Sequence, residues 1–450
     1  MSKEMDMLHG KLGGKILLFA IPLAATGILQ QLFNAADVAV VGTFVGPDAM
    51  AAVGSNSAII GLMVNLFVGI SLGANVVISG FTGRHDAENV HKAVHTAVIF
   101  APLAGVAMML IGELISAPLL TLMGVPDKVM GMALAYLRIY LTGLPVIFLY
   151  NFEAAIFRSQ GNTKTPLICL LVSGIINVIL NLFFVIIVGM TADGVALATV
   201  ISNVVSSALM FFMLVRNKGE IRLRREDMHV SVSLLKKMLV IGVPAGLQGM
   251  VFSLSNICIQ SAINSLGTVV MAASAAAFNI EIFAYYIINS FGQACTTFTS
   301  QNRGAGYYER CRRILVICLI QGSAAALLAA VCLLVPGREL LSIFNKNTAV
   351  INYGMIRLKY IVGTQLLSVL IEVFSGCLRG HEHSAGPALM ALAGVCGVRI
   401  AWVYTVFRMA PSFGRLIVVY PVSWVVTSAA IIGFYFIKRR ELYHLETIRS

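Results

Sequence analysis

Charged residues are scarce in this sequence. Asp, Glu, Lys and Arg make up 12% of the 450 residues, about half of what soluble domains carry, whereas 58% of the residues are hydrophobic. The mean hydropathy is +0.88. A soluble domain could not bury so much apolar surface, so lipid is the expected solvent for most of the chain.

The motifs of metal, nucleotide and redox sites are also missing. The eight Cys are scattered, mostly through apolar runs, without C-x-x-C or zinc-like spacing, so we interpret them as reduced hydrophobic residues. The segment 10–15 lacks the spacing of a phosphate-binding P-loop, and no cofactor is expected. His381, Glu382 and His383 do not match the zinc motif H-E-x-x-H.

Long apolar stretches are what the sequence has instead. Each runs for about 20 residues or more, which is the length needed to cross the hydrocarbon core of a bilayer. Breaks at Gly, Pro and charged residues divide these stretches into twelve expected transmembrane helices. The expected spans are 15–43, 53–79, 93–117, 133–156, 166–189, 194–215, 238–265, 270–298, 314–336, 351–376, 387–407 and 416–437.

The positions of positive charge predict the orientation. Most of the 32 Lys and Arg fall at the two ends and in alternate connecting segments, as expected of cytoplasmic segments. We therefore predict a multi-pass protein of the plasma (inner) membrane with both termini in the cytoplasm. The net charge of +12 then reflects topology and contact with anionic lipid, and no nucleic-acid partner is predicted.

An internal repeat relates the two halves of the chain. Arg158 and Pro166 recur 221 residues later as Arg379 and Pro387 (379 − 158 and 387 − 166). Because each half has an even number of spans, we predict an all-α polytopic membrane protein whose two six-helix bundles are related by a pseudo-two-fold axis along the membrane normal. Further pairs at this offset or one residue more are Met50 and Met271, Ser79 and Ser300, Gly83 and Gly304, Glu88 and Glu309, Pro22 and Pro244, and Asn34 and Asn256.

The repeat also predicts the domain boundaries. We expect an N-terminal six-helix bundle over 1–215, a basic cytoplasmic connector over 216–237, a C-terminal six-helix bundle over 238–437 and a cytoplasmic tail over 438–450. Transporters built in this way bind their substrate between the halves and expose it to each side of the membrane in turn.

Asp37 lies in the outer half of the first span, where a charged group costs at least about 2.5 kcal/mol on insertion scales. Its functional interpretation is a carboxylate that alternately binds and releases a proton or Na⁺. The structural alternative is a hydrogen bond between helices or a position near the outer water. Pro22 in the same span is the predicted hinge, where the helix would bend or repack once Asp37 is neutralised.

Neutral oxygen atoms for a cation are available on two other spans. Asn177 and Asn181 are four residues apart on the fifth span and hence on one helix face. Together with Thr199 on the sixth span, they are candidates for a cage around Asp37. Hydrogen bonds between helices are the alternative role of all three. No metal ion is predicted other than Na⁺ at Asp37.

Glu281 is the acidic candidate in the second half. It lies near the middle of the eighth span among aromatic residues, so in a cavity it would suit an organic cation. The alternative is an ion pair with a basic group such as Arg399.

Polar residues on the first and seventh spans complete the predicted substrate site. If they face inward they line a wet cleft, and if they face neighbouring helices they only hold the bundle together. The predicted substrate-binding set is Gln31, Asn34, Gln248, Asn256, Gln260 and Glu281.

At these residues the chain resembles the multidrug and toxic compound extrusion (MATE) family of secondary transporters. The resemblance covers nearly the whole length. It is carried by I-P-L in the first span, A-D-V-A-V-V-G around Asp37, F-R-S-Q-G-N-T-K-T-P from Phe157, G-V-A-L-A-T-V from Gly194, G-V-P-A-G-L-Q from Gly242, Q-N-R-G-A-G from Gln301 and C-L-R-G from Cys377.

The resemblance implies two six-helix bundles that export drugs, dyes or metabolites in exchange for H⁺ or Na⁺. Carried over residue by residue, the cation site of some members falls here on a set of four, with Asn181 where other members have Asp. One carboxylate is then left in the cage. The implied set is Asp37, Asn177, Asn181 and Thr199.

The leading hypothesis is a cation-coupled antiporter that exports organic drugs or metabolites, cationic or amphiphilic, by alternating access. It would act as a monomer whose partners are the substrate and membrane lipid. An alternative within transport is a flippase for a lipid-linked or amphiphilic molecule, which a cationic cleft would favour. A weaker alternative is a membrane-embedded metal-dependent enzyme with its site at His381 and Glu372. The chain is thus predicted to be a transporter rather than an enzyme.

Overall fold

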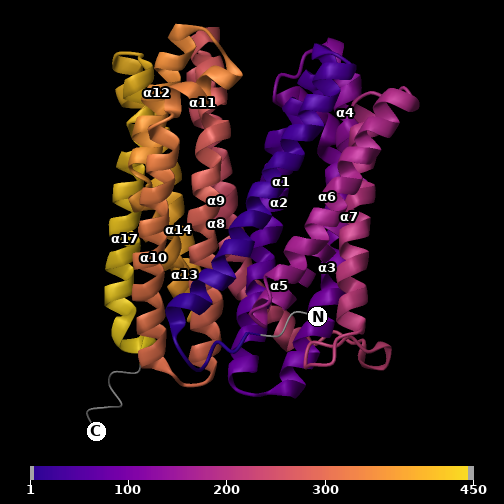
Figure 1. Cartoon of the computed structure of the whole chain (residues 1–450), viewed down its shortest axis with the longest axis vertical. Coiled ribbons are helices and arrows are strands. Elements are labelled where there is room, and N and C mark those ends of the chain that lie inside the picture. Colours follow the sequence, from indigo (N-terminus) through magenta and orange to yellow (C-terminus); the bar gives the residue numbers. More distant parts are fainter. Residues whose placement is uncertain (1–4, 444–450) are drawn as a thin grey trace. The chain divides into compact units, whose positions relative to one another are not determined.

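The computed structural model describes residues 5–443, which form helices and contain no β-strand (Figure 1). These residues divide into two compact units. Unit 1 consists of Met5 and Ala25–Leu239, and unit 2 consists of Asp6–Ala24 and the residues from Val240 onward. The predicted all-α class is confirmed.

Unit 1 is a helical bundle in which α5 packs between α2 and α3, while α7 packs against α4 and α6. Large apolar side chains such as Leu114 and Ile187 remain exposed on its surface, as expected for helices that face lipid. The helices with residues in unit 1 are α1 (Leu12–Phe44), α2 (Pro47–Gly83), α3 (Ala87–Leu122), α4 (Asp127–Thr142), α5 (Leu144–Ser159), α6 (Lys164–Leu182), the π-helix η1 (Phe183–Ile187), α7 (Ala192–Val215), the 3₁₀-helix η2 (Arg225–Asp227) and the start of α8 (Val232–Asn264).

Unit 2 is built around α9, which packs against α10, α12 and α13, and α17 in turn packs against α13. The start of α1 and most of α8 also belong to it. Its other helices are α9 (Thr268–Gly304), α10 (Tyr308–Leu334), α11 (Gly337–Phe344), α12 (Thr348–Gly363), α13 (Gln365–Gly380), α14 (Ala385–Ala391), the π-helix η3 (Leu392–Gly397), α15 (Val398–Trp402), the π-helix η4 (Val403–Phe407), α16 (Phe413–Ile417) and α17 (Val419–Leu442).

The described chain has ten helices that are long and apolar enough to cross a membrane, and two bent pairs bring the number to as many as twelve. The expected spans 133–156 and 351–376 are therefore not single straight helices. The helices α4 and α5 meet at 48°, and α12 and α13 meet at 40°. In unit 1 the bend falls at Gly143, just before Pro145, whose missing N–H cannot continue the helical ladder.

The internal repeat is visible in the lengths of the helices. The helices α2 and α9 both have 37 residues, and their first residues are 221 apart (268 − 47). All four members of the two bent pairs have 16 residues, and α12 begins 221 residues after α4. The halves differ at η3, because the residues 221 positions earlier, 171–176, are α-helical.

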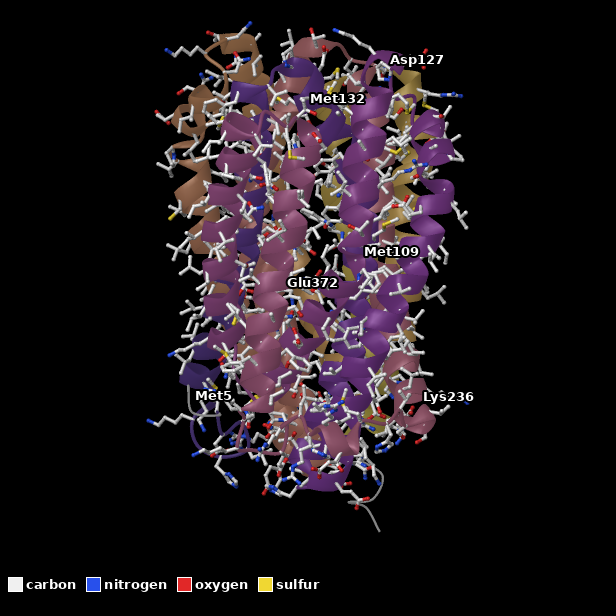
Figure 2. The ribbon with its side chains drawn as sticks, turned by 90° about the vertical axis from the view of Figure 1, so that its right-hand side faces the viewer. Met5, Met109, Asp127, Met132, Lys236 and Glu372 are labelled. Carbon is white, nitrogen blue, oxygen red and sulfur yellow. The ribbon has the colours of Figure 1, made fainter. Side chains whose placement is uncertain are left out.

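The helices of unit 1 run between two ends of the bundle. Met5 and Lys236 lie at one end, whereas Asp127 and Met132, at the start of α4, lie at the other (Figure 2). The beginning and the end of unit 1 are thus on the same side, as an even number of crossings requires.

Candidate functional site

Asp37 lies in the last third of α1 and is 6% exposed. Its Oδ1 accepts a hydrogen bond from Nδ2 of Asn181 at 2.5 Å. Its Oδ2 lies 3.2 Å from Oγ1 of Thr199, which is also 3.0 Å from the carbonyl of Val195. Because a hydroxyl has one proton, Thr199 can donate to only one of these two acceptors at a time.

Asn177 and Asn181 share one face of α6, as their spacing of four residues predicts. Asn181 Nδ2 is 3.2 Å from Oδ1 of Asn177, and Asn177 Nδ2 donates to Thr199 at 3.3 Å. The structure therefore brings all four predicted cage residues together from α1, α6 and α7. One acceptor is left over, since the buried Oδ1 of Asn181 has no hydrogen-bond partner in the described part of the chain.

The surroundings of this cluster are apolar. Buried side chains of the neighbouring turns, among them Val41, Val185 and Val195, pack together with partly buried Val38. Among residues 5–443, the ion pairs within unit 1 join other carboxylates, and none includes Asp37. A carboxylate without a cationic partner is costly at such a place, and a bound proton or metal cation removes that cost.

Glu281 on α9 forms a buried ion pair with Arg357 on α12. Its Oε1 and Oε2 accept hydrogen bonds from Nη2 and Nε of Arg357 at 2.6 and 3.0 Å, and Nη1 of Arg357 donates to Ser274 at 2.7 Å. The ion-pair alternative for Glu281 is thus the one that the structure shows, with Arg357 rather than Arg399 as the partner. This pair must open before Glu281 can hold an organic cation.

Arg399 on α15 is 1% exposed and has neutral partners. Its Nε donates to Oγ of Ser423 at 3.1 Å, while its Nη1 donates to Oγ of Ser255 and to Oδ1 of Asn256, both at 3.0 Å. Its Cζ lies 4.3 Å from the centre of the Tyr420 ring, a cation–π contact. No carboxylate within residues 5–443 forms an ion pair with it.

The other predicted substrate residues are divided between the units. In unit 1, Gln31 is half-buried and Asn34 is exposed on α1. In unit 2, Asn256 and Gln260 are exposed on α8, whereas Gln248 is buried and its Oε1 has no recorded partner among the described residues. Their role in binding a substrate stays a prediction.

The predicted hinge lies close to a unit boundary. Pro22 is inside α1, and the helix continues through it. The chain changes from unit 2 to unit 1 after Ala24, two residues further along. The helix α8 changes from unit 1 to unit 2 after Leu239, five residues before Pro244. Each of the two helices that are shared between units therefore has a proline near its boundary.

The site required by the enzyme alternative does not form. No group of His, Cys, Asp or Glu that could hold a metal ion occurs in the described part of the chain. Glu382 pairs instead with Arg303 at 2.8 Å, and Glu372 lies 3.8 Å from Arg379.

Sequence reasoning missed two residues of unit 2: Arg357, which pairs with Glu281, and Tyr420, whose ring contacts Arg399. Arg357 stands well inside an apolar span, which was the available signal that it has a buried partner. The repeat offered a signal for Tyr420, which follows Thr199 by 221 residues.

Comparisons with known proteins give the family. The sequence profile of the MatE family matches residues 22–183 and residues 244–405, once in each half. The chain is 27% identical over 429 residues to the "Probable multidrug resistance protein YoeA" of Bacillus subtilis, a match that covers 93% of this chain and 92% of the relative. It is 22% identical over 324 residues to the "FAD transporter" of Shewanella oneidensis, with 71% of each protein covered.

The solved structures agree with the profile. A multidrug resistance MATE family transporter of the MOP superfamily in an outward-facing conformation matches with a TM-score of 0.89 and 20% identity, over 99% of both chains. This likeness concerns the fold alone. The two profile matches, however, cover more than half of the sequence, and each begins at the proline of a boundary helix. The chain therefore belongs to the MatE family, and it is a membrane transporter rather than an enzyme.

Proposed function

We propose that this protein is a cation-coupled antiporter that exports an organic drug or metabolite by alternating access, with H⁺ or Na⁺ as the coupling ion. Relatives named as multidrug resistance and export proteins support the export of organic solutes. The name of the FAD transporter extends the candidate substrates to amphiphilic metabolites.

The observation that carries the proposal is the environment of Asp37. The side chain of Asp37 is a buried carboxylate with only neutral hydrogen-bond partners. Next to it, the buried Oδ1 of Asn181 has no hydrogen-bond partner in the described chain. A bound proton would turn Asp37 into a donor for such an acceptor, and a bound Na⁺ would use both oxygen atoms as ligands. Either cation satisfies the acceptor and neutralises the charge in one step.

Cation binding would then be linked to the conformational cycle through α1. Asp37 and Pro22 are on the same helix, on opposite sides of its unit boundary. A neutral Asp37 no longer needs the donors of α6 and α7 in the same arrangement, so its binding state can bias the arrangement of α1. The proline lowers the cost of bending there because it lacks the N–H of an ordinary helical residue.

Transport by purified protein in proteoliposomes tests the proposal. We expect Asp37→Asn to reduce substrate transport driven by an imposed pH or Na⁺ gradient by at least about tenfold, because the variant cannot exchange a charge at this site. Asp48→Asn is the matched control, since Asp48 is a surface carboxylate in the first turn of α2 and is paired with Lys128. Gradient-driven transport by Asp37→Asn at the wild-type rate would reject the assignment.

We further propose an oligomeric state, a membrane and an orientation for the protein. It would be a monomer in the plasma (inner) membrane with both termini in the cytoplasm, and it would need no cofactor besides its coupling ion. Protease accessibility of the 216–231 segment in right-side-out vesicles, compared with inside-out vesicles, tests the orientation.

A second candidate is a flippase for an anionic amphiphile. The observation that favours it is Arg399, a buried guanidinium in unit 2 without an ion-pair partner within residues 5–443. Movement of a fluorescent lipid between leaflets, with and without a cation gradient, separates the two candidates.

A further inference from the structure

The charged residues buried around Tyr420 in unit 2 do not balance. Glu281 and Arg357 neutralise each other through two hydrogen bonds. Arg399 then adds one positive charge, and its recorded partners are the neutral side chains of Ser255, Asn256 and Ser423. Neutral oxygens solvate a guanidinium only in part, so the cluster attracts a negative group.

Donors remain available in this cluster. A guanidinium has five N–H groups, and the partners of Arg399 in the described chain are bonded to Nε and Nη1, which leaves the N–H groups of Nη2. The Tyr420 ring is in contact with two cations, with the Cζ atoms of Arg399 and Arg357 at 4.3 and 5.6 Å from its centre. Two arginines share one ring, so an anion beside them would relieve their mutual repulsion.

The cluster is also within reach of the surface of unit 2. Asn256, which accepts the bond from Nη1 of Arg399, is exposed, and Tyr420 Oη lies 3.4 Å from the same Asn256 oxygen. One hydrogen-bond partner of the buried guanidinium is therefore itself exposed, and rotation of its amide would free one N–H group of Nη1 for another acceptor.

The repeat shows that this cluster stands where unit 1 has its cation site. Tyr420 corresponds to Thr199 at the offset of 221, and Ile259 corresponds to Asp37 at 222, as Asn256 does to Asn34. A turn of π-helix contains one residue more than a turn of α-helix, so η3 raises the offset from the 221 of α14 to 222 in α15, the helix that follows it. Arg399 then corresponds to Asn177. The same location holds one negative charge in unit 1 and one positive charge in unit 2.

We propose that Arg399, assisted by Asn256 and Tyr420, binds the carboxylate or phosphate group of the transported molecule. A planar guanidinium matches both groups, because each presents two oxygen atoms to its paired N–H donors. That the bound molecule is also transported rests on the proposed export function. The binding step itself needs neither a gradient nor a coupling ion. The substrate class would thus be organic anions and zwitterions.

The protein carries its own reporter for such binding. Its two Trp residues are both in unit 2, Trp402 three residues after Arg399 and Trp424 with its ring 6.1 Å from that of Tyr420. In a Trp402→Phe background, the fluorescence of Trp424 reports on the cluster. Octanoate, octyl phosphate and octylammonium are suitable probes because they share one chain, differ in charge and do not absorb in the same range.

We expect both anions to bind at least about tenfold more tightly than octylammonium, and Arg399→Gln to weaken the anions by at least about tenfold. Arg338→Gln, which removes an exposed guanidinium of the same unit, is the control and should leave the affinities unchanged. Arg399→Lys keeps the charge without the paired donors, so it should give intermediate affinity, and it replaces Arg399→Gln if that variant does not fold. Equal affinity for octylammonium, or unchanged anion binding in the variants, would overturn the proposal.

Two further arms complete the experiment. In nanodiscs of phosphatidylcholine, octyl phosphate should bind; if phosphatidylglycerol abolishes that binding, a lipid phosphate is the occupant, and if it does not, a free solute is. Absence of anion binding in both lipids rejects the site. The variant Asp37→Asn should bind the anions normally, so that loss of gradient-driven transport and loss of anion binding can be told apart.

Discussion

At Asp37, one carboxylate is held by one amide and one hydroxyl, with no basic residue in the cluster. On the proposed uptake of H⁺ or Na⁺, the charge of the cage would therefore change by one. The residue at position 181 determines how many negative charges the cage holds. A carboxylate in place of Asn181 would add a second charge at about hydrogen-bond distance from the carboxylate of Asp37.

The variant Asn181→Asp tests this interpretation. Two adjacent buried carboxylates cannot both be ionised without a cation, so we expect Na⁺ affinity, measured by isothermal titration calorimetry, to rise by about tenfold. Asn162→Asp, at the polar turn before α6, is the control. If Na⁺ binding is the same in both variants, the Asn181 position does not belong to a cation site.

The cage could be predicted from the sequence because Asn177 and Asn181 are one helical turn apart and Thr199 is a polar residue on the next span, and the family resemblance pointed to the same residues. The partner of Glu281 could not, since Arg357 lies 76 residues away on a different helix and only the packing of α9 against α12 joins them. The spacing of residues along the sequence predicts which of them share a face of one helix. It does not predict which faces of different helices pack against each other.

Among the elements, the bent span formed by α4 and α5 depends on close contact with α3. A Cβ atom added to Gly105 would lie 2.4 Å from Cα of Pro145, a backbone atom that cannot move aside. We expect Gly105→Ala to lower the free energy of unfolding by about 1–3 kcal/mol, because overpacking must displace a backbone. Thermal unfolding in detergent, followed by light scattering, measures the effect.

Gly61→Ala is the matched control, since nothing lies within 4 Å of a Cβ at that position on α2. Alanine has the better helix propensity, so this variant should be neutral or slightly stabilised. A Gly105→Ala protein as stable as Gly61→Ala would show that α3 and α5 are not in such close contact.

The connector docks on α3 through polar contacts. Asp227 lies 2.9 Å from Nε2 of His91, and the backbone N–H of Ser231 donates to Thr96 at 3.0 Å. The hydrogen bond from His91 holds the pKa of Asp227 below its usual 3.8. Because a depressed pKa stabilises the ionised, docked form, this contribution is present above about pH 4 and is lost as the pH falls through the lowered pKa.

Hydrogen–deuterium exchange of residues 224–231, corrected for intrinsic rates, checks this dependence. We expect faster exchange at about pH 3 than at about pH 6 in the wild type, and fast exchange at both values in Asp227→Asn. Asp48→Asn should behave as the wild type does. Slow exchange in Asp227→Asn would mean that the other contacts hold the connector by themselves.

Most helices were predictable because apolar stretches longer than a bilayer is thick leave few alternatives. The bends at Gly143 and Thr364 were not, since hydropathy runs on through both positions and only the angle between the helices changes. The extra residue in η3 was likewise hidden, because an insertion inside an apolar run does not alter its length noticeably.

At the scale of the whole molecule, two helices connect the units, and each has a proline near the boundary. Pro22→Ala restores an N–H donor to α1 and should stiffen it. We expect slower transport, by about threefold to tenfold, with unchanged substrate affinity, because a conformational step and not a binding contact is altered. Pro102→Ala, inside a helix that belongs to unit 1 alone, is the control.

Initial transport rates over a range of substrate concentrations separate the two effects. A raised half-saturating concentration in Pro22→Ala would place the residue in a binding site. Equal slowing by Pro102→Ala would show that any proline of the bundle has the same effect, and that the boundary position has no special part in the cycle.

The turn of π-helix at η3 also determines the direction in which the following side chains point around the helix axis. Successive residues of an α-helix are about 100° apart around the axis, so one added residue rotates every later side chain by that amount. Arg399 follows the last residue of this turn by two positions, on the side of the helix that meets Ser423 and Asn256. Loss of a single codon within 392–397 would therefore direct the guanidinium away from the cluster. The charge of the proposed anion site would then change with chain length, while every neighbouring residue kept its identity.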